Sequence, residues 1–315
     1  MPSTTVLPLA HQTWFVHHAE DYPLDWSALA RTEVLLGLAL VLVVASAWRV
    51  VASKIGAVEL RPLAPLGRLA PYAPRLLAAH LGLSLVLLGA SRAVLDPGVV
   101  APAGWAGTLL LVPQFVAGAL LVAGVLVRQA AAAVVLAGPV LLVLSGPRSL
   151  FMCLALLGIA TFLLLLPPDP EQGGRAVLDP ARLRPALLAL RLGTAGTLLT
   201  LAVVEKLANP AMGEAMLAQE PVLNLLAPIG VPSGTFIVLA GLIEVLFAAL
   251  VLSGAAPQLV ALVAAVPFTA SLALFGGTEL IGHLPVYGVL LTLLVLGSAQ
   301  DTAAEVPALP VPHRA

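Results

Sequence analysis

Six residues in the second half of the chain have side chains that could handle protons or bind a small polar group. They are Arg191, Glu205, Lys206, Glu244, Glu279 and His283. Each lies in or beside a long apolar run, where an ionised group costs several kcal/mol unless it is partnered. The pKa of a buried carboxyl is set by its surroundings, so such groups recur in proton-handling sites. We treat these six as the functional candidates, and the sequence does not single out a catalytic residue among them.

Glu244 is the most informative of the six because it lies near the middle of its apolar run. Arg191 stands at a similar depth in the preceding run, which should be antiparallel to it. We therefore predict an Arg191–Glu244 ion pair. Such a pair could simply lock two helices in register, or it could form a proton-handling or quinone-contacting site.

Glu205 and Lys206 stand side by side in "LAVVEKLANP", at the end of an apolar run. Adjacent residues on a helix point about 100° apart, so the two cannot face one partner together. The long stem of Lys206 favours an anchor that reaches the lipid headgroups. A carboxylate near a helix C-terminus opposes the helix dipole, so Glu205 should have a cationic or hydrogen-bonding partner.

The stretch "GGTELIGHLP" places Glu279 and His283 four residues apart before the last apolar run. Its glycines and Pro285 predict a turn, with Pro285 at the start of the last helix. Glu279 and His283 could be a satisfied loop pair, or an acid–histidine proton relay near the membrane surface. We expect them to form an outer cluster with Glu205.

The N-terminal segment "AHQTWFVHHAEDYPLDW" contains three histidines and several aromatic residues. His11, His17 and His18 are weak metal candidates because their spacing matches no standard motif, so we predict no metal site. The aromatic residues instead favour docking on the membrane surface or on the outer mouth of the helices. There the segment could cover Glu205, Lys206, Glu279 and His283 as a lid.

The composition identifies the kind of protein. Of 315 residues, 60% are hydrophobic and 10% are charged, and the mean hydropathy is +1.05. Soluble domains carry about 25% charged residues, so this chain cannot coat a globule with polar surface. The net charge of −1 does not suggest a nucleic-acid partner, and the single Cys153 excludes an internal disulfide. We therefore expect an all-α polytopic membrane protein whose main partner is the lipid bilayer.

Apolar runs of about 20 residues, enough to cross a bilayer, recur along the whole chain. They predict nine transmembrane helices, at 33–52, 76–95, 105–127, 129–145, 149–167, 184–206, 233–253, 257–276 and 283–299. Lys and Arg concentrate in the loops on one side, ten against four, with Arg191 inside a helix. The positive-inside rule then places the N-terminus outside and the C-terminus in the cytoplasm. The expected location is a bacterial-type plasma (inner) membrane.

An internal repeat follows the first predicted span. "PRLLAAHLGLSLVLLGASRAVLDP" resembles "PALLALRLGTAGTLLTLAVVEKLANP", and the later helices correspond in the same order. Four spans per copy make both copies parallel. The predicted divisions are an extracytoplasmic segment 1–31, a lone helix with a basic cytoplasmic loop 32–75, four-helix bundles 76–168 and 182–299, and a disordered cytoplasmic tail 300–315.

The second copy resembles the DoxX/DoxD-like family of four-helix membrane proteins. The matching positions are Arg191 and Lys206 in "RLGTAGTLLTLAVVEKL" and Glu244 in "FIVLAGLIEVLFAALVLSG". The first copy departs from the pattern, with His80 or Arg75 near the Arg position, Arg92 near the Lys position and Gly118 where the Glu would be. It therefore resembles a degenerate copy that has lost its acid.

The resemblance implies a redox-associated, quinone-proximal membrane subunit that acts with a soluble oxidoreductase partner, so quinone is the candidate cofactor. The alternatives are a small-molecule or proton-coupled transporter, supported by the repeat and the buried charges, and a non-catalytic scaffold, supported by the degenerate first copy. The sequence does not determine the oligomeric state, or whether the protein is an enzyme.

Overall fold

A computed structural model describes residue 16 and residues 21–55, 60–275, 277–299 and 302. Within these residues the chain is almost entirely helical, which confirms the all-α prediction. The one strand pair described is a short antiparallel hairpin of β1 (Ala93–Val94) and β2 (Asp96–Val100).

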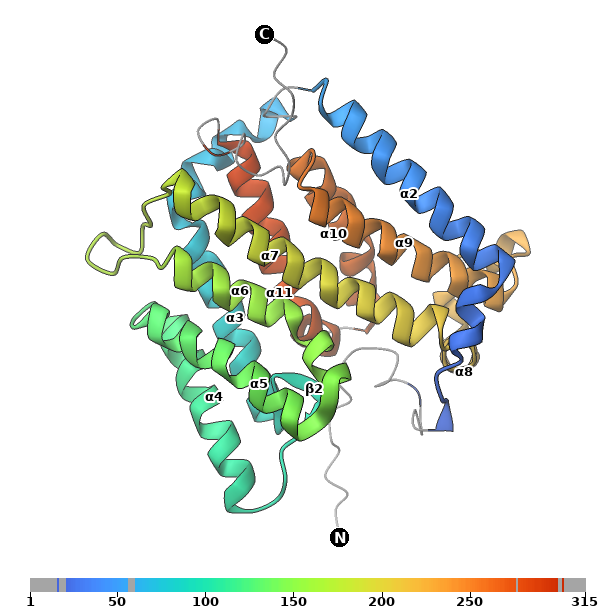
Figure 1. Ribbon diagram of the computed structural model, residues 1–315, viewed down its shortest axis with the longest axis horizontal. Helices are drawn as coiled ribbons and strands as arrows, with labels where there is room; N and C mark the ends of the chain where they lie inside the picture. The colour runs from blue at the N-terminus through green and yellow to red at the C-terminus, as the bar shows by residue number, and fades with distance from the viewer. Residues whose placement is uncertain (1–15, 17–20, 56–59, 276, 300–301, 303–315) are drawn as a thin grey trace.

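The helices follow the order expected from the apolar runs (Figure 1). Those of the first half are α2 (Thr32–Ala52), the 3₁₀-helix η3 (Arg61–Tyr72), α3 (Ala73–Ala90), α4 (Trp105–Ala123), α5 (Val127–Met152) and α6 (Leu154–Leu165). Those of the second half are α7 (Pro180–Leu201), the π-helix η4 (Ala202–Leu207), α8 (Pro210–Gln219), α9 (Ser233–Ser253), α10 (Pro257–Phe275) and α11 (Gly277–Ser298). The short 3₁₀ turns are η2 (Trp26–Ala30), η5 (Pro221–Leu223) and η6 (Ala227–Ile229).

Six of the described helices are long and apolar enough to cross a membrane. They correspond to α2, η3 with α3, α4, α5, α7 with η4, and α9. Three shorter apolar helices lie at Leu154–Leu165, Pro257–Leu272 and Gly282–Ser298. Each predicted span therefore coincides with an apolar helix, but length and composition do not confirm the count of nine.

Helix α5 is broken where the sequence predicts a turn between two spans. Gly146 has φ 79° and ψ −179°, which is incompatible with a continuous helix. Glycine reaches positive φ without the steric cost of a Cβ. The break redirects the chain just before Arg148, so it positions a residue of the candidate site.

The two predicted four-helix units do not stand apart. Helix α6 packs extensively on α7, and α3 packs on α11, so each unit contributes to the other's interface. The four helices of the first unit can be matched in order with those of the second, α3 with α7, α4 with α9, α5 with α10 and α6 with α11. Under this matching the α6–α7 contact corresponds to the α11–α3 contact. In the same way, the α3–α4 contact corresponds to the α7–α9 contact, and the α5–α6 contact corresponds to the α10–α11 contact. Two parallel copies related by a two-fold axis would give this pattern of contacts, and the repeat itself stays a prediction.

Close helix contacts are made at glycines. An added Cβ at Gly82 of α3 would lie 2.6 Å from the Gly118 carbonyl oxygen of α4. One at Gly158 of α6 would lie 2.7 Å from the Ala189 carbonyl oxygen and 3.0 Å from the Gly193 Cα of α7. Small residues let backbones approach in this way where water does not drive helix association.

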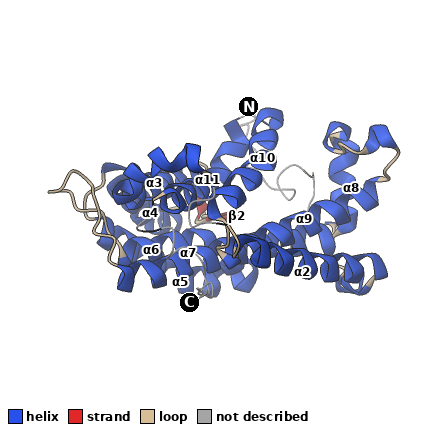
Figure 2. Ribbon diagram, turned by 90° about the horizontal axis from the view of Figure 1, so that it is seen from above, coloured by secondary structure: helices blue, strands red, loops and turns tan. Residues whose placement is uncertain are grey.

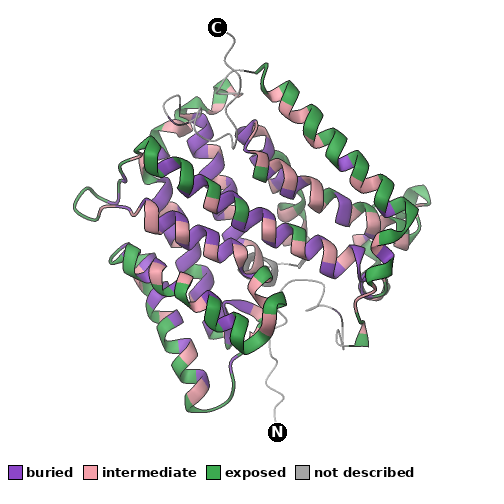
Figure 3. Cartoon of the chain, viewed as in Figure 1, coloured by how far each residue is buried: buried purple, intermediate pink, exposed green. Residues whose placement is uncertain are grey.

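The buried side chains concentrate where the two halves meet. Figure 3 shows them along α3, α6, α7 and α11, whereas α2 and α4 are largely exposed. Helix α2 packs on α9, with Gly37 against the side chain of Leu242. It is the lone helix of the prediction, and its exposed face is apolar, as a lipid-facing surface would be.

Successive long helices run in opposite directions, so the connections between them gather at two opposite ends of the molecule. We call the end with α8 and the β1–β2 hairpin the α8 end; Figure 2 shows α8 lying off the layer of α2, α7 and α9. At the opposite, basic end, Arg75 Nη2 donates to the Val122 carbonyl oxygen at 2.6 Å, and Ala176 N donates to Pro71 O at 2.7 Å. The described basic residues at that end are Arg49, Lys54, Arg61, Arg68, Arg75, Arg128, Arg175, Arg182 and Arg184. Which end faces the cytoplasm stays a prediction.

Candidate functional site

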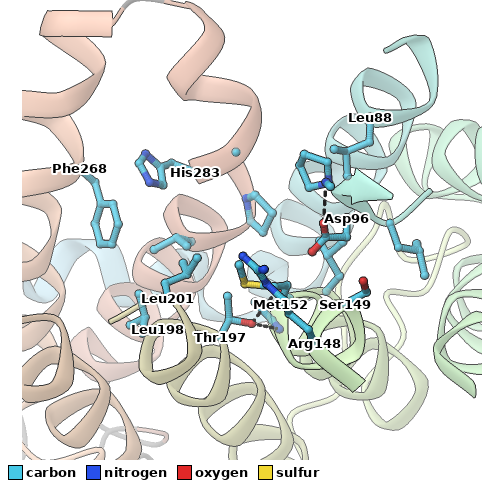
Figure 4. A pocket seen from close by; sticks show the side chains of 18 of the residues that line it. Leu88, Asp96, Arg148, Ser149, Met152, Thr197, Leu198, Leu201, Phe268 and His283 are labelled. Atoms are coloured by element: carbon cyan, nitrogen blue, oxygen red, sulfur yellow. Dashed lines mark hydrogen bonds between the residues drawn. The ribbon is translucent and has the colours of Figure 1, made fainter. Parts of the chain in front are cut away.

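A cavity of about 380 Å³ opens at the α8 end, between the two halves. Its wall is built from the α3–α4 connection, the α5–α6 junction, α7, α8, α10 and α11. Figure 4 shows Asp96, Arg148 and Ser149 on one side and His283 and Phe268 on the other. The polar lining residues are Tyr22, Asp96, Arg148, Ser149, Thr197, Asn209 and His283.

Asp96 is held in the cavity wall by the hairpin that follows α3. Gln114 of α4 ties this hairpin down: its Nε2 donates to the carbonyl oxygens of Leu85 and Ala93 at 3.0 and 2.9 Å. Its Oε1 accepts from Leu95 N at 3.0 Å. These bonds satisfy the backbone where α3 ends, and they fix the orientation of the residue that follows.

The carboxyl of Asp96 is 8% exposed, and its Oδ1 accepts from Gly98 N at 2.6 Å. Burial raises the pKa of Asp96 to about 6, although the hydrogen bond from Gly98 favours the charged form. The carboxylate of Glu205 raises the pKa further, and the guanidinium of Arg148 lowers it. A carboxyl with this pKa can exchange a proton near neutral pH, and no motif in the sequence predicts it.

Arg148 projects into the cavity from the chain just after the break at Gly146 (Figure 4). Within the described residues, its guanidinium forms no hydrogen bond or ion pair with the protein. Its neighbour Ser149 makes only a long contact of 3.5 Å to the Ser145 carbonyl oxygen. The α5–α6 junction thus presents hydrogen-bond donors that the fold itself does not use.

Thr197 of α7 joins the floor of the cavity to the start of α6. Its hydroxyl oxygen accepts from Ala155 N at 2.8 Å, and its hydroxyl donates to the Met152 carbonyl oxygen at 3.1 Å. The rest of the wall is mainly apolar; its members include Leu88, Leu95, Met152, Leu156, Leu198, Leu201, Met212, Phe268 and Val286.

His283 lines the cavity opposite Asp96, with its ring edge-on to Phe268 at 4.8 Å between centroids. The predicted turn before it is wrong: α11 begins at Gly277 and continues through Pro285. A proline in a helix removes only one backbone hydrogen bond, and packing against α10 and α3 supports the helix on both sides. The side chain of Glu279, and with it the expected cluster with Glu205, lies outside the described residues.

Glu244 forms its ion pair with Lys206, not with Arg191 as predicted. Lys206 Nζ lies 2.8 Å from Glu244 Oε1, and the two side chains are 12% and 28% exposed. Arg191 is itself buried, with 2% exposed. It stands 15 residues before Lys206, or roughly 22 Å along a helix, so one carboxylate cannot serve both cations.

The pair depends on the π-helix that ends α7. The wider turn is closed by a hydrogen bond of 2.8 Å from Ala208 N to the Val203 carbonyl oxygen, five residues earlier. Lys206 is turned toward α9 rather than extended to the headgroups, which corrects the anchor reading. Glu205, on the same turn, is buried at 1% exposed and is not a surface group. Isolated π-turns often mark functional positions.

Of the described part of the N-terminal segment, Tyr22 lies in the cavity lining, and the wider lid stays a prediction. Asn209 Nδ2 donates to the Tyr22 carbonyl oxygen at 3.1 Å, and Asp25 N donates to the Ala208 carbonyl oxygen at 2.7 Å. Tyr22 and Asn209 both line the cavity. His11, His17 and His18 lie outside the described residues. Within the described part, no group of three metal-binding side chains is present.

Asp96, Arg148 and Asn209 are the cavity residues that reading the sequence missed. Asp96 and Asn209 occupy matching positions in the two segments predicted to be copies, in "LDP" and "ANP", and each follows the first helix of its segment. This shared position is the feature of the sequence from which a common site for Asp96 and Asn209 could have been predicted. No such feature marks Arg148, because it lies at a break in the chain 52 residues beyond Asp96.

Comparison with protein families, curated proteins and solved structures finds no match to this chain. The resemblance to the DoxX/DoxD-like family therefore rests only on the motif residues, and the functional argument rests on the cavity.

Proposed function

We propose that this protein is a membrane protein that binds a small amphipathic molecule of the quinone type in the cavity at its α8 end. The observation that carries the proposal is the composition of the cavity. One wall offers a carboxyl that titrates near neutral pH and an arginine, while most of the remaining lining is apolar. Ligand sites are commonly apolar with a few placed polar groups.

A quinone matches this lining because its ring oxygens accept hydrogen bonds and its body is apolar. It also dissolves in the bilayer that the apolar helices would occupy. The DoxX-like positions Lys206 and Glu244 form an ion pair at the same end of the molecule. We therefore extend the proposal to a redox-associated membrane subunit that exchanges reducing equivalents with a soluble oxidoreductase partner.

Bound quinone can be tested by purifying the protein in native-lipid discs, extracting it and detecting quinone by mass spectrometry. Ser149→Trp would fill the cavity, whereas Ser145→Trp, four residues earlier, before the break at Gly146 and outside the lining, is the matched control. We expect the wild type and Ser145→Trp to retain quinone and Ser149→Trp to lose it. Absence of quinone from the wild type, or equal retention by Ser149→Trp, contradicts the proposal.

A proton-coupled transporter is the second candidate, favoured by the position of the cavity between two repeat-like halves. Transporter sites commonly lie at such interfaces. This function predicts a proton flux into proteoliposomes that falls when Glu244→Gln removes the charge facing Lys206. A flux that is absent from the wild type, or unchanged in the variant, counts against it.

A further inference from the structure

The polar groups of the cavity differ in how many of their hydrogen-bonding atoms are already bonded to other atoms of the protein. The hydroxyl of Thr197 bonds the backbone on both sides of the α5–α6 junction. Asn209 Nδ2 donates to the Tyr22 carbonyl oxygen, and its Oδ1 accepts from Met212 N at 3.3 Å, which caps α8. These groups hold the wall together and have little capacity left for a ligand.

Two groups do retain capacity within the described chain. The five N–H donors of Arg148 have no hydrogen-bond acceptor there. Asp96 has one oxygen bound to Gly98 N, and its second oxygen carries no hydrogen bond. Figure 4 shows both side chains on the side of the cavity where Ser149 also lies. A ligand at this side would meet several donors and one group that can accept or donate a proton.

The opposite side of the cavity offers mostly apolar surface. Phe268 of α10, Leu198 of α7 and Val286 of α11 pack into one cluster there. The cavity is therefore polarised: Arg148 of the α5–α6 junction and Asp96 of β2 lie at one side, and the side toward the second half is mainly apolar apart from His283.

From this polarity we infer that Arg148 and Asp96 form the subsite for the ring oxygens of a benzoquinone or benzoquinol, with its apolar part against Phe268, Leu198 and Val286. The inference rests on the proposed function only in taking the cavity as the place where the ligand binds. Arg148 donates to a ring oxygen in both redox forms. Asp96 donates a hydrogen bond to the quinone when protonated and accepts one from the quinol hydroxyl when ionised.

Two simpler ligand classes satisfy only one of these residues. A carboxylate amphiphile would pair with Arg148 but would be repelled by ionised Asp96 and by Glu205. An ammonium amphiphile would pair with Asp96 and be repelled by Arg148. A neutral quinone uses both residues because its two oxygens can accept from Arg148 and from protonated Asp96, and the quinol uses both because its hydroxyls can accept from Arg148 and donate to ionised Asp96.

The charged and titratable groups around Asp96 set the direction of the pH dependence. Arg148 comes from α5 and Glu205 from η4, His283 of α11 lies across the cavity, and α4 contributes the neutral Gln114. Protonation of Asp96, whose pKa is about 6, supplies a donor to the quinone and replaces the charged acceptor of the quinol hydroxyl with a weaker neutral one. Quinone binding should therefore strengthen, and quinol binding weaken, as the pH falls through about 6.

The test measures binding of decyl-benzoquinone and of its reduced form to the full chain in lipid discs, from about pH 5 to about pH 8. Arg148→Gln should weaken both ligands about tenfold, the loss typical of a hydrogen bond to a charged group. Arg148→Lys should restore part of the affinity. Asp96→Asn should abolish the opposite pH dependences of the two forms. Arg31→Gln is the control, because Arg31 lies at the same end but pairs with Asp25 at 3.5 Å, outside the cavity.

The outcomes separate this inference from the proposed function. If the wild type binds and Ser149→Trp does not, but Arg148→Gln and Asp96→Asn both bind as the wild type does, the head subsite is wrong and the cavity remains the ligand site. If the wild type binds neither form, both proposals fail. Tighter binding of decanoate that depends on Arg148 and not on Asp96 would also overturn the inference, because the ligand would then be an anionic amphiphile.

Discussion

At the scale of single residues, charged side chains gather at two neighbouring places, where Asp96 is buried and Arg148 is exposed. Asp96 and Arg148 face the cavity, and Lys206 and Glu244 form an ion pair between η4 and α9. Glu205 connects the two, since its charge acts on Asp96 and lies next to Lys206 in the chain. A change at either place should therefore be felt at the other.

The Lys206–Glu244 pair can be examined with single and double variants. Lys206→Met and Glu244→Gln each remove one partner, and Lys206→Met leaves a largely buried carboxylate without its cation. We expect each single variant to lose about 1–3 kcal/mol of stability and the double variant to lose less than their sum. Thermal unfolding in lipid discs measures this, with Glu33→Gln at the exposed start of α2 as the control. Strict additivity would show that the pair contributes no coupling.

Asp96 should make stability depend on pH. Its pKa is about 6 in the folded chain and about 4 when unfolded, so the folded state binds the proton more tightly. Stability therefore falls as the pH rises from about 4 to about 6, by roughly 2–3 kcal/mol, and is level above that range. Asp96→Asn should remove this fall, whereas Glu171→Gln in an exposed loop should not. Parallel melting curves for the wild type and Asp96→Asn across this range would be contrary evidence.

At the scale of elements, the helices were the most predictable feature, because apolar length is a local property of the sequence. The span predicted at 233–253 coincides with α9, and α2 begins within one residue of its prediction. The partner of Glu244 was predicted wrongly because it depends on the register of two packed helices and on a π-turn, neither of which has a local signal. The α11 start was missed because Gly and Pro propensities were outweighed by packing on α3 and α10.

The close contact between α6 and α7 predicts a difference between two glycines three residues apart. A Cβ at Gly193 would strike the backbone of Leu154 and Gly158, whereas one at Gly196 would meet only the flexible Leu154 side chain. Gly193→Ala should cost about 1–3 kcal/mol of stability, and Gly196→Ala should cost clearly less. Melting temperatures of the two variants in the same lipid discs decide this. Equal costs would mean that the helices can separate freely.

The start of α8 should control the N-terminal segment. Asn209→Ala removes both the hydrogen bond to the Tyr22 carbonyl oxygen and the cap on α8, so the segment around Tyr22 should loosen. A Ser149→Cys reporter in a Cys153→Ala background should then react faster with a water-soluble maleimide. Asn224→Ala, a polar residue of the same connection that bonds Val231 instead, is the control. An unchanged rate would show that the segment does not cover the cavity.

At the scale of the whole molecule, the two interlocked halves meet at the described cavity, which opens at the end with few basic residues. The sequence indicated the halves through their repeated order, and of its functional candidates only His283 lies in the described lining of the cavity. It did not reveal the cavity, because Asp96, Arg148 and Asn209 come from three separate connections that only the packing of α3 on α11 and α6 on α7 brings together.

The central claim is that a quinone-type molecule occupies this cavity, and photoaffinity labelling in native membranes tests it most directly. A photoreactive benzoquinone should label peptides that contain Met152–Leu156 and Leu198–Leu201, and excess unlabelled quinone should suppress this labelling. Helix α2, whose apolar face is exposed, serves as the internal measure of labelling from the bilayer. Labelling confined to α2, or labelling of the cavity peptides that excess quinone does not reduce, would contradict the claim.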